Sequence, residues 1–169
     1  MGDAYFDRLA RYNGWANERL YDACAALGEG ERKLKRPSFF GSIHATLNHL
    51  LVVDRLWMSR LVGGALALPL NAILYEDFAA LRAARRGQDK LLAELVASIA
   101  AARLDDPLAY HNTRGEAFTT PIRLVLGHLF NHQTHHRGQV HDMLSQTVVA
   151  PPELDLILFM RQEEAAGQV

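Results

Sequence analysis

Apolar residues recur at spacings of three and four along four long stretches of the chain, which is the periodicity of amphipathic helices. The stretches cover residues 3–27, 42–62, 75–103 and 120–146. Ser42 is the expected N-cap of the second helix, and Thr120 followed by Pro121 is an N-cap and first-turn pattern that opens the fourth. The pattern therefore predicts an all-α fold, a four-helix bundle.

The connections between these helices differ from one another. Residues 29–41 are charged, whereas residues 65–74 are apolar but interrupted by Pro69, which predicts a loop packed over the end of the bundle. Residues 108–118 alternate apolar and polar side chains around an Asn-Thr-Arg-Gly turn, so we expect a short hairpin before the fourth helix. A short C-terminal helix is predicted over residues 154–164.

Composition limits the class of protein. The chain has 169 residues, 49% of them hydrophobic, which predicts a single globular domain over residues 1–169. Its 18 basic and 19 acidic residues leave no positive surplus, so nucleic acid is not an expected partner. We find no apolar run long enough to span a membrane and no signal peptide, so a cytoplasmic location without a membrane partner is expected. The lone Cys24 is expected to be buried and inert.

Histidines are concentrated in the predicted fourth helix, which holds five of the eight in the chain. On a helical wheel, His136 falls inside the apolar face of this helix and His132 falls on the edge of that face. His128 and His135 flank the face, and His141 lies opposite it. His132 and His136 are therefore the predicted inward pair.

The spacing of four places His132 and His136 one turn apart, about 6 Å along the helix axis, which suits two ligands of one metal ion. The same spacing occurs in the His-Glu-x-x-His motif of zinc proteases. Here Gln133 stands in place of the glutamate, and an amide cannot act as a general base. A protease of that type is therefore disfavoured, and Arg137 is predicted to have a hydrogen-bonding or interhelical role rather than a catalytic one.

A third ligand is expected from the second helix. His44 shares a polar stripe with Asn48 and Arg55, and we assign it to the surface. His49 projects among apolar residues, where an imidazole without a partner would cost about 1–3 kcal/mol. His49 is therefore the predicted third metal ligand, and Asp54 with Arg55 is interpreted as a solvated ion pair.

A structural role for these histidines stays open at this point. A single inward histidine is usually a hydrogen-bonded core residue, and pairs at a spacing of four also arise by chance in a histidine-rich helix. Three inward imidazoles on two helices are harder to satisfy with hydrogen bonds alone. The sequence therefore favours a metal site over a structural role.

Four motifs add a family resemblance to this geometry. The second and fourth helices carry N-H-L-x-x-x-D-x-x-W at residues 48–57 and N-H-x-x-x-H-R-G-Q at residues 131–139. With "ARYNGWANERLYDA" at residues 10–23 and "PPELDLILFM" at residues 151–160, they resemble the DinB/YfiT-like superfamily of metal-dependent helical proteins. That superfamily is unrelated to the DNA polymerase of the same name, and the resemblance covers nearly the whole chain.

The resemblance implies an up-down-down-up four-helix bundle, often a homodimer. It also implies a metal, commonly nickel or zinc, held by one histidine of the second helix and an H-x-x-x-H pair of the last bundle helix. These positions match His49, His132 and His136. Related proteins include thiol-cofactor transferases and a mycothiol-dependent isomerase, so the resemblance implies a small-molecule substrate, with a low-molecular-weight thiol as one candidate.

Three neutral nitrogen ligands leave a divalent ion with its full charge and an open position. Such an ion lowers the pKa of bound water, which favours hydrolysis, or binds a thiolate, which favours thiol transfer. Helical geometry places no carboxylate beside the histidines, so no catalytic residue is assigned. We therefore expect a metal-dependent transferase or hydrolase. The alternatives are a non-catalytic metal-binding or stress-response protein and a metal-free interaction module.

Overall fold

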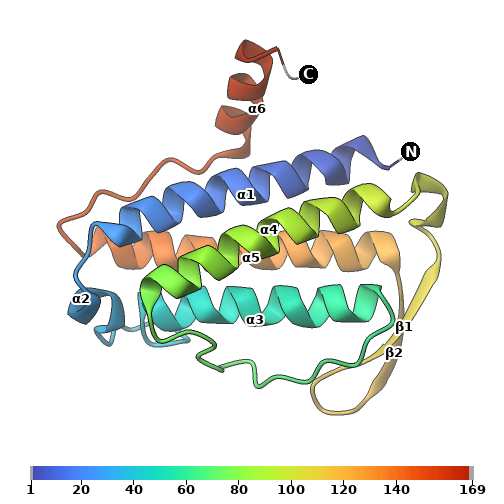
Figure 1. Cartoon of the computed structure of the whole chain (residues 1–169), viewed down its shortest axis with the longest axis horizontal. Helices are drawn as coiled ribbons and strands as arrows, with labels where there is room; N and C mark the ends of the chain where they lie inside the picture. Colours follow the sequence, from blue (N-terminus) through green and yellow to red (C-terminus); the bar gives the residue numbers. More distant parts are fainter. Residues whose placement is uncertain (1, 168–169) are drawn as a thin grey trace.

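The computed structural model describes residues 2–167, which are mostly helical with one small sheet (Figure 1). The helices are α1 (Ala4–Ala25), α2 (Glu29–Lys33), α3 (Ile43–Leu61), α4 (Phe78–Ser98), a 3-10 turn (Ala101–Arg103), α5 (Ile122–Ser145) and α6 (Leu156–Ala165). The antiparallel strands are β1 (Pro107–His111) and β2 (Ala117–Pro121). The predicted long helices and the predicted hairpin are present, whereas α2 lies in a segment that we expected to be a plain connection.

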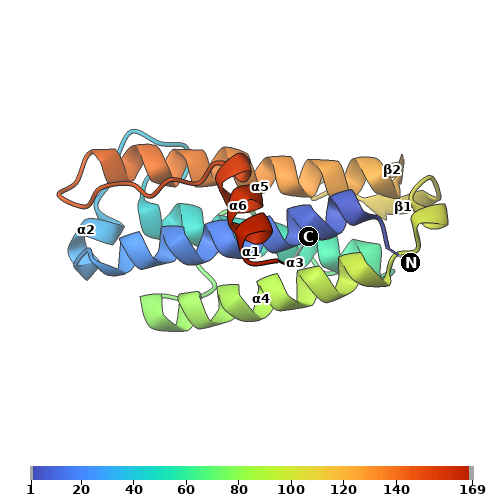
Figure 2. The same cartoon turned by 90° about the horizontal axis from the view of Figure 1, so that it is seen from above.

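The long helices α1, α3, α4 and α5 lie side by side along the longest axis of the molecule (Figure 1, Figure 2). α3 and α4 run in the same direction, because residues 62–77 travel back along the molecule to the end at which α3 began. We call this segment the α3–α4 connection. The sequence predicts that its apolar part, residues 65–74, packs over the end of the helices. It lies along α3 instead, where the Leu70 carbonyl accepts a hydrogen bond from an α3 side chain.

Side-chain caps set the starts of α3 and α4. The Ser42 hydroxyl accepts a hydrogen bond from the backbone N–H of Ala45 at 3.1 Å, which confirms the predicted cap. The Asp77 carboxylate accepts from the N–H of Ala80 at 2.7 Å in the same way. α4 therefore begins at Phe78, slightly later than the hydrophobic pattern indicated.

The start of α5 differs from the prediction. Thr120 and Pro121 belong to β2, and no side-chain cap is formed at the start of the helix. The backbone N–H groups of Ile122 and Arg123 donate instead to carbonyl oxygens in the turn that precedes β1. The turn that precedes the hairpin therefore satisfies two of the backbone donors at the start of α5.

The apolar core consists of two main clusters arranged along the long helices. One cluster contains residues of all four long helices, among them Leu20, Leu47, Leu81 and Met143. The other lies toward the hairpin and includes Leu92, Val96, Leu126 and Leu129. Each long helix also has at least one buried polar residue between the positions that belong to the two clusters.

These polar residues form a layer across the middle of the molecule, which we call the polar layer. Its members are Asn13, Asn17, Asp54, Arg85, Asp89, Gln133 and Arg137. Arg85 pairs with Asp54 at 2.7 Å and with Asp89 at 2.8 Å. Asn13 and Asn17 each donate a hydrogen bond to Asp89 at 3.0 Å. The layer therefore joins α1, α3 and α4.

Two residues of α5 complete the polar layer. Gln133 donates to the Asp54 carboxylate at 2.6 Å, and Arg137 donates to the side-chain oxygen of Asn13. The interhelical role predicted for Arg137 is confirmed. Because two arginines balance two aspartates, the layer buries charges without burying a net charge.

The assignment of Asp54 to a solvated ion pair with Arg55 was wrong. Asp54 is fully buried, and its partners reach it from α4 and α5. Arg55 lies against Tyr75 instead and donates to the Tyr75 hydroxyl at 3.1 Å. Partners on distant helices decide the environment of Asp54, and neighbouring residues in the sequence do not reveal them.

α6 lies on the outer side of α1, against which it packs (Figure 1). Its Phe159 contacts the rings of Tyr12 and Trp15, with centroids 5.9 Å and 5.6 Å away. Glu163 pairs with Arg11 at 2.7 Å. The predicted C-terminal helix is therefore confirmed, with an aromatic contact and an ion pair that hold it on α1.

Replacing Arg85 tests the polar layer. Arg85→Met removes the positive charge between Asp54 and Asp89, so we expect a loss of about 3–5 kcal/mol in the free energy of unfolding, measured with urea. Arg86→Met is the matched control on the same helix, because Arg86 pairs with Glu18 at the surface and should matter little. Equal effects of the two substitutions would contradict the role given to the layer.

Candidate metal centre

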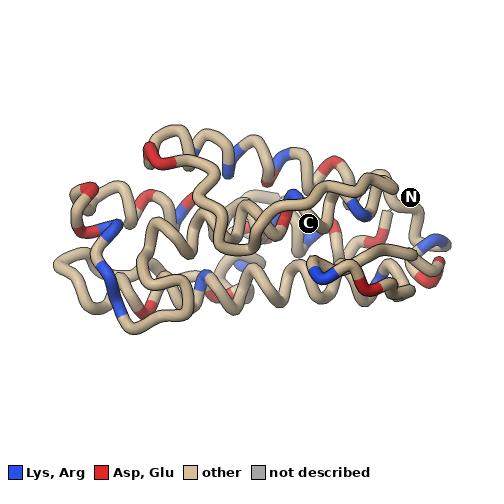
Figure 3. Tube along the Cα trace, turned by 90° about the horizontal axis from the view of Figure 1, so that it is seen from below, with Lys and Arg blue, Asp and Glu red and all other residues tan. Residues whose placement is uncertain are grey.

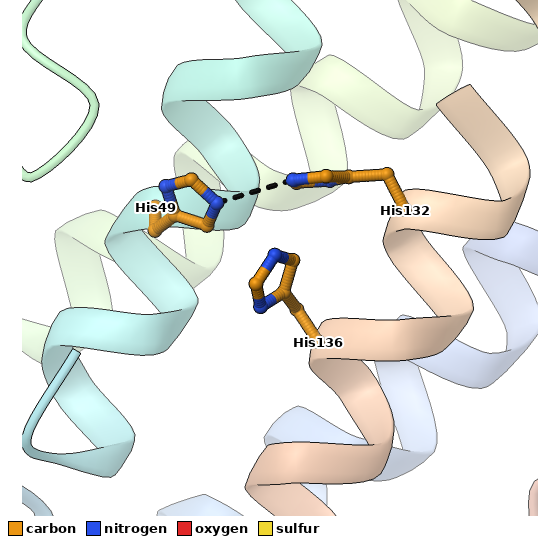
Figure 4. Close-up of side chains that lie close together, drawn as sticks. All are labelled: His49, His132 and His136. Carbon is orange, nitrogen blue, oxygen red and sulfur yellow. Dashed lines mark hydrogen bonds between the residues drawn. The ribbon is translucent and has the colours of Figure 1, made fainter. Parts of the chain in front are cut away.

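Three histidines from two helices converge at one point beside α3 (Figure 4). His49 belongs to α3, and His132 and His136 belong to consecutive turns of α5. Each offers a ring nitrogen, and these three atoms lie within 4.8 Å of one another. The Nε2 atoms of His49 and His132 are 3.1 Å apart. The structure thus brings together the three predicted residues, while their role as metal ligands stays a prediction.

The burial of the three imidazole rings agrees with the helical-wheel prediction. His49 and His136 are 4% and 8% exposed, and His132, which the wheel placed at the edge of the apolar face, is half-buried. His128 and His135 flank the cluster, with ring centroids 5.9 Å from His132 and 4.7 Å from His136 respectively. They lie beside the candidate site without contributing to it.

Hydrogen bonds fix which nitrogen of two of the rings faces the cluster. The Leu70 carbonyl can only accept, so it takes a proton from Nδ1 of His49 at 2.7 Å. Nδ1 of His136 lies 2.8 Å from the side-chain oxygen of Gln139 and donates to it. In a neutral ring the remaining Nε2 then carries a lone pair. Figure 4 shows one nitrogen of His136 pointing toward the pair formed by His49 and His132.

The arrangement fits a divalent cation. Two nitrogen ligands of one tetrahedral zinc ion lie about 3.3 Å apart, given bonds of about 2.0–2.1 Å, and the observed separation of Nε2 atoms is 3.1 Å. His132 differs from the other two histidines, because its buried Nδ1 has no hydrogen-bond partner among residues 2–167. Backbone and amide oxygens behind His49 and His136 are the supports that metal-binding histidines usually have.

The three imidazoles are held in the neutral form that metal binding requires. Burial, together with the proximity of the other rings, lowers the pKa of His132 to about 3. Burial lowers the pKa of His49 to about 4, although the hydrogen bond to Leu70 opposes the shift. Burial also lowers the pKa of His136. At neutral pH the cluster therefore offers lone pairs rather than positive charges.

An aromatic side chain covers one side of the cluster. The Phe40 ring stacks on His49 with centroids 3.8 Å apart and meets the edge of His136 at 5.4 Å. Phe40 lies in a turn closed by Gly41, whose φ of +78° suits glycine. Arg36 ties this turn to α2, since its guanidinium donates to the backbone and carboxylate of Glu31. α2 therefore helps to position the ring over His49.

The assignment of His44 to the surface was wrong. His44 is buried and donates through Nε2 to the Tyr75 carbonyl at 2.9 Å. Asn48 also donates to that carbonyl at 3.2 Å, and its own oxygen accepts from the Tyr75 N–H at 3.0 Å. The α3–α4 connection covers the polar stripe of α3, so His44 holds this connection and is not a ligand candidate.

Sequence reasoning missed three residues that support the cluster, and the signals available for them differ. Gln139 follows His136 by three positions, so the two side chains lie on one helical face and the spacing is a usable signal. Any residue can supply the carbonyl that Leu70 supplies, so its side chain gives no signal. Phe40 is identified only by the fold of the turn that carries it.

Two other sequence expectations concern chemistry at the site. Gln133 is fully buried and donates to Asp54, so it takes no part in the histidine cluster. Cys24 is also fully buried, and burial raises the pKa of its thiol to about 12, which agrees with an inert role. No carboxylate belongs to the histidine cluster in the described part of the chain.

Comparison with known proteins identifies the family. A model of the DinB family matches residues 1–167. Protein DinB of Bacillus subtilis (strain 168) is 30% identical over 174 residues, an alignment that covers 98% of this chain and 100% of that protein. The chain belongs to the DinB family. The resemblance noted in the sequence is therefore confirmed.

The two histidine motifs of this DinB chain lie on facing helices. Each motif supplies residues both to the histidine cluster and to the polar layer. In α3, His49 faces the cluster and Asp54 enters the polar layer. In α5, His132 and His136 face the cluster, while the residues that follow each of them enter the polar layer. Each motif thus combines site residues with residues that orient the helix.

The low pKa of His132 generates a prediction about stability. In the unfolded chain this imidazole takes a proton near its ordinary pKa of about 6.5, whereas in the fold it stays neutral until about pH 3. As pH falls below about 6.5, the unfolded state gains protons and the metal-free fold loses stability. His132→Phe removes this contribution, so the stability of the variant should depend less steeply on pH.

The difference is measurable by urea unfolding with a chelator present. Near pH 5 the free energy of unfolding of the original protein should fall about 1.4 kcal/mol more per pH unit than that of His132→Phe. Comparing slopes rather than absolute values removes the effect of the substitution on packing. Parallel slopes between pH 7 and pH 5 would contradict the neutral, buried state of His132.

Proposed function

We propose that this DinB-family protein is a metal-dependent transferase or hydrolase built on a single-domain four-helix bundle. Its metal ligands would be His49, His132 and His136. The observation that carries the proposal is the orientation of two of these rings. A carbonyl-type oxygen holds Nδ1 of His49 and another holds Nδ1 of His136, so their Nε2 lone pairs are directed at the cluster. Three neutral nitrogens form the ligand set of many catalytic zinc sites.

Nickel or zinc is the proposed ion, because imidazole nitrogens suit both. When bound, a divalent cation supplies Lewis acidity, which would polarise a substrate or stabilise a thiolate. The chain's own residues keep the rings in place: Leu70 orients His49, and Gln139 orients His136. Phe40 excludes water from the His49 ring on the side that it stacks against.

A low-molecular-weight thiol and an electrophile are the proposed substrates of the transferase. Sulfur would bond to the electrophilic carbon as the leaving group departs with its electron pair, and the thiol proton would pass to solvent. A hollow of about 440 Å³ supports access for a small molecule, since Gln139, which bonds to His136, lines it. Pro37, Phe39, His135 and Asp142 also line this hollow.

One observation favours a non-catalytic alternative. Within residues 2–167 no carboxylate joins the histidine cluster, so the site lacks a group that would serve directly as general base. A metal-binding protein of a stress response would need no such group. The two candidate functions share the metal and differ in turnover.

We propose a homodimer in the cytoplasm that acts on small molecules and does not bind nucleic acid. Basic and acidic residues are interspersed along the helices, which supports the last point (Figure 3). No helix in the described part of the chain combines the length and the apolar character needed to cross a membrane.

Metal analysis tests the ligand set. Protein produced without a histidine tag and loaded with nickel or zinc should retain a stoichiometric ion after gel filtration, measured by mass spectrometry of the metal. His49→Ala, His132→Ala and His136→Ala should each weaken binding by about tenfold or more, because each removes a direct ligand. His128→Ala is the matched control and should retain the ion. Absence of a stoichiometric ion in the original protein would leave a metal-free module.

Turnover separates the transferase or hydrolase from the non-catalytic alternative. The metal-loaded protein should consume a low-molecular-weight thiol in the presence of a reactive electrophile, or hydrolyse an activated ester or amide, at a rate above that of the free ion. His136→Ala should lose this activity while remaining folded by circular dichroism. A metal-loaded protein that turns over no member of such a panel would favour the non-catalytic function.

A further inference from the structure

A second cavity lies beyond the histidines, between the α3–α4 connection and the hairpin. It has a volume of about 930 Å³, within the range of small-molecule sites. Residues 63–70 line one side and residues 109–113 line the other, with Leu56 and Arg60 of α3 between them. Figure 1 shows the connection passing the hairpin at this end of the molecule.

The lining combines apolar side chains of the α3–α4 connection with the polar side chains of His111, Asn112 and Thr113 and with one unpaired cation, Arg60. Leu66 and Leu70 are both 43% exposed, so the connection presents leucine side chains that the protein itself leaves uncovered. Arg60 is half-buried, and no carboxylate in the described residues pairs with it or lines the cavity. A cavity that combines apolar side chains with a few polar groups and a cation suits an amphipathic ligand.

Two aromatic rings hold the Arg60 guanidinium at the cavity. Its central carbon lies 4.5 Å from the centroid of Trp57 and 5.3 Å from that of Tyr110. The rings are themselves in edge contact at 5.0 Å. Burial lowers the pKa of Arg60, which reflects a charge removed from water without a counterion. These contacts preorganise the guanidinium but satisfy none of its hydrogen-bond donors.

The cavity also lies on the histidine face of α3. Arg60 follows His49 by eleven positions, so the two side chains differ by about 20° around the helix and lie about 16 Å apart along it. Ring contacts continue between them: Trp57 meets His128 at 5.3 Å, and His128 meets His132 at 5.9 Å. An elongated molecule in the cavity would therefore extend along the path that leads to the cluster.

We propose that this cavity binds an organic anion that has an apolar chain and one carboxylate. The carboxylate pairs with Arg60, whose planar fork matches it in two parallel hydrogen bonds. The chain covers Leu66 and Leu70. Binding depends on the cavity alone. Its use as the substrate pocket of the histidine site rests on the proposed function and is tested separately.

Decanoate is a suitable probe, with decanol as the neutral ligand of equal length and acetate as the short anion. The chain has two tryptophans, and Trp15→Phe leaves Trp57 as the reporter beside Arg60. In this background and with a chelator present, decanoate below its micelle concentration should change Trp57 fluorescence with saturation. Decanol should bind at least about tenfold more weakly, because it lacks the charge that pairs with Arg60.

Arg60→Gln should weaken decanoate binding by about tenfold or more and leave decanol binding unchanged. Arg55→Gln is the matched control on the same helix, because Arg55 contacts Tyr75 outside the cavity, and it should bind decanoate normally. Equal binding of decanoate and decanol, binding of acetate as tight as that of decanoate, or an unchanged affinity in Arg60→Gln would overturn the proposal. The ligand comparison on the Arg60 protein decides the matter even if Arg60→Gln does not fold.

The chelator makes failure of this proposal distinct from failure of the metal proposal. Saturable binding of decanoate to metal-free protein, tighter than that of decanol and of acetate, establishes the cavity site whether or not nickel or zinc binds. If metal-loaded protein then shows turnover, decanoate should inhibit it competitively with an inhibition constant close to its dissociation constant. Turnover that saturating decanoate leaves unaffected would rule out the cavity as the substrate pocket.

Discussion

The ion pairs of Arg85 with Asp54 and Asp89 constrain the arrangement of the long helices. A buried charge costs several kcal/mol unless a partner compensates it, so helices that carry such charges must meet at particular depths and rotations. Apolar clusters on either side tolerate several packings, because leucine contacts are not directional. The polar layer selects one of these packings, since Gln133 and Arg137 must also reach their partners on other helices.

This constraint also positions the histidines. Gln133 and Arg137 directly follow His132 and His136, so consecutive residues point about 100° apart around α5. Once Gln133 and Arg137 are bound to the polar layer, the rotation of α5 about its axis is fixed and the imidazoles face α3. The layer therefore acts on the candidate metal centre through the helix axis, without contacting a ring. A substitution in the layer would change the direction of the imidazoles as well as the stability.

Periodicity identified the features that depend on a single element. It predicted the long helices and the inward direction of His136, because both depend on helical geometry alone. It failed where a distant segment decides the environment: Asp54 is buried by partners from α4 and α5, and His44 is covered by Tyr75 of the α3–α4 connection. Thr120 is a residue type that often caps helices, but here it pairs with Leu108 in the hairpin. These contacts join residues far apart in the sequence, which local patterns do not record.

The α3–α4 connection links the histidine cluster to the second cavity. Its Leu70 lines the cavity, and the carbonyl of the same residue holds Nδ1 of His49. Farther along, the Tyr75 carbonyl is held by His44 and Asn48, so the connection is tied to α3 at two places. A ligand that moved Leu70 would lengthen the hydrogen bond between the Leu70 carbonyl and Nδ1 of His49, which sets the tautomer of His49. A ligand that packed against Leu70 without moving it would preserve this hydrogen bond. Since the connection is already tied to α3 at Leu70 and at Tyr75, packing without movement requires less disruption, and the cavity can be filled while His49 keeps its lone pair directed at the cluster.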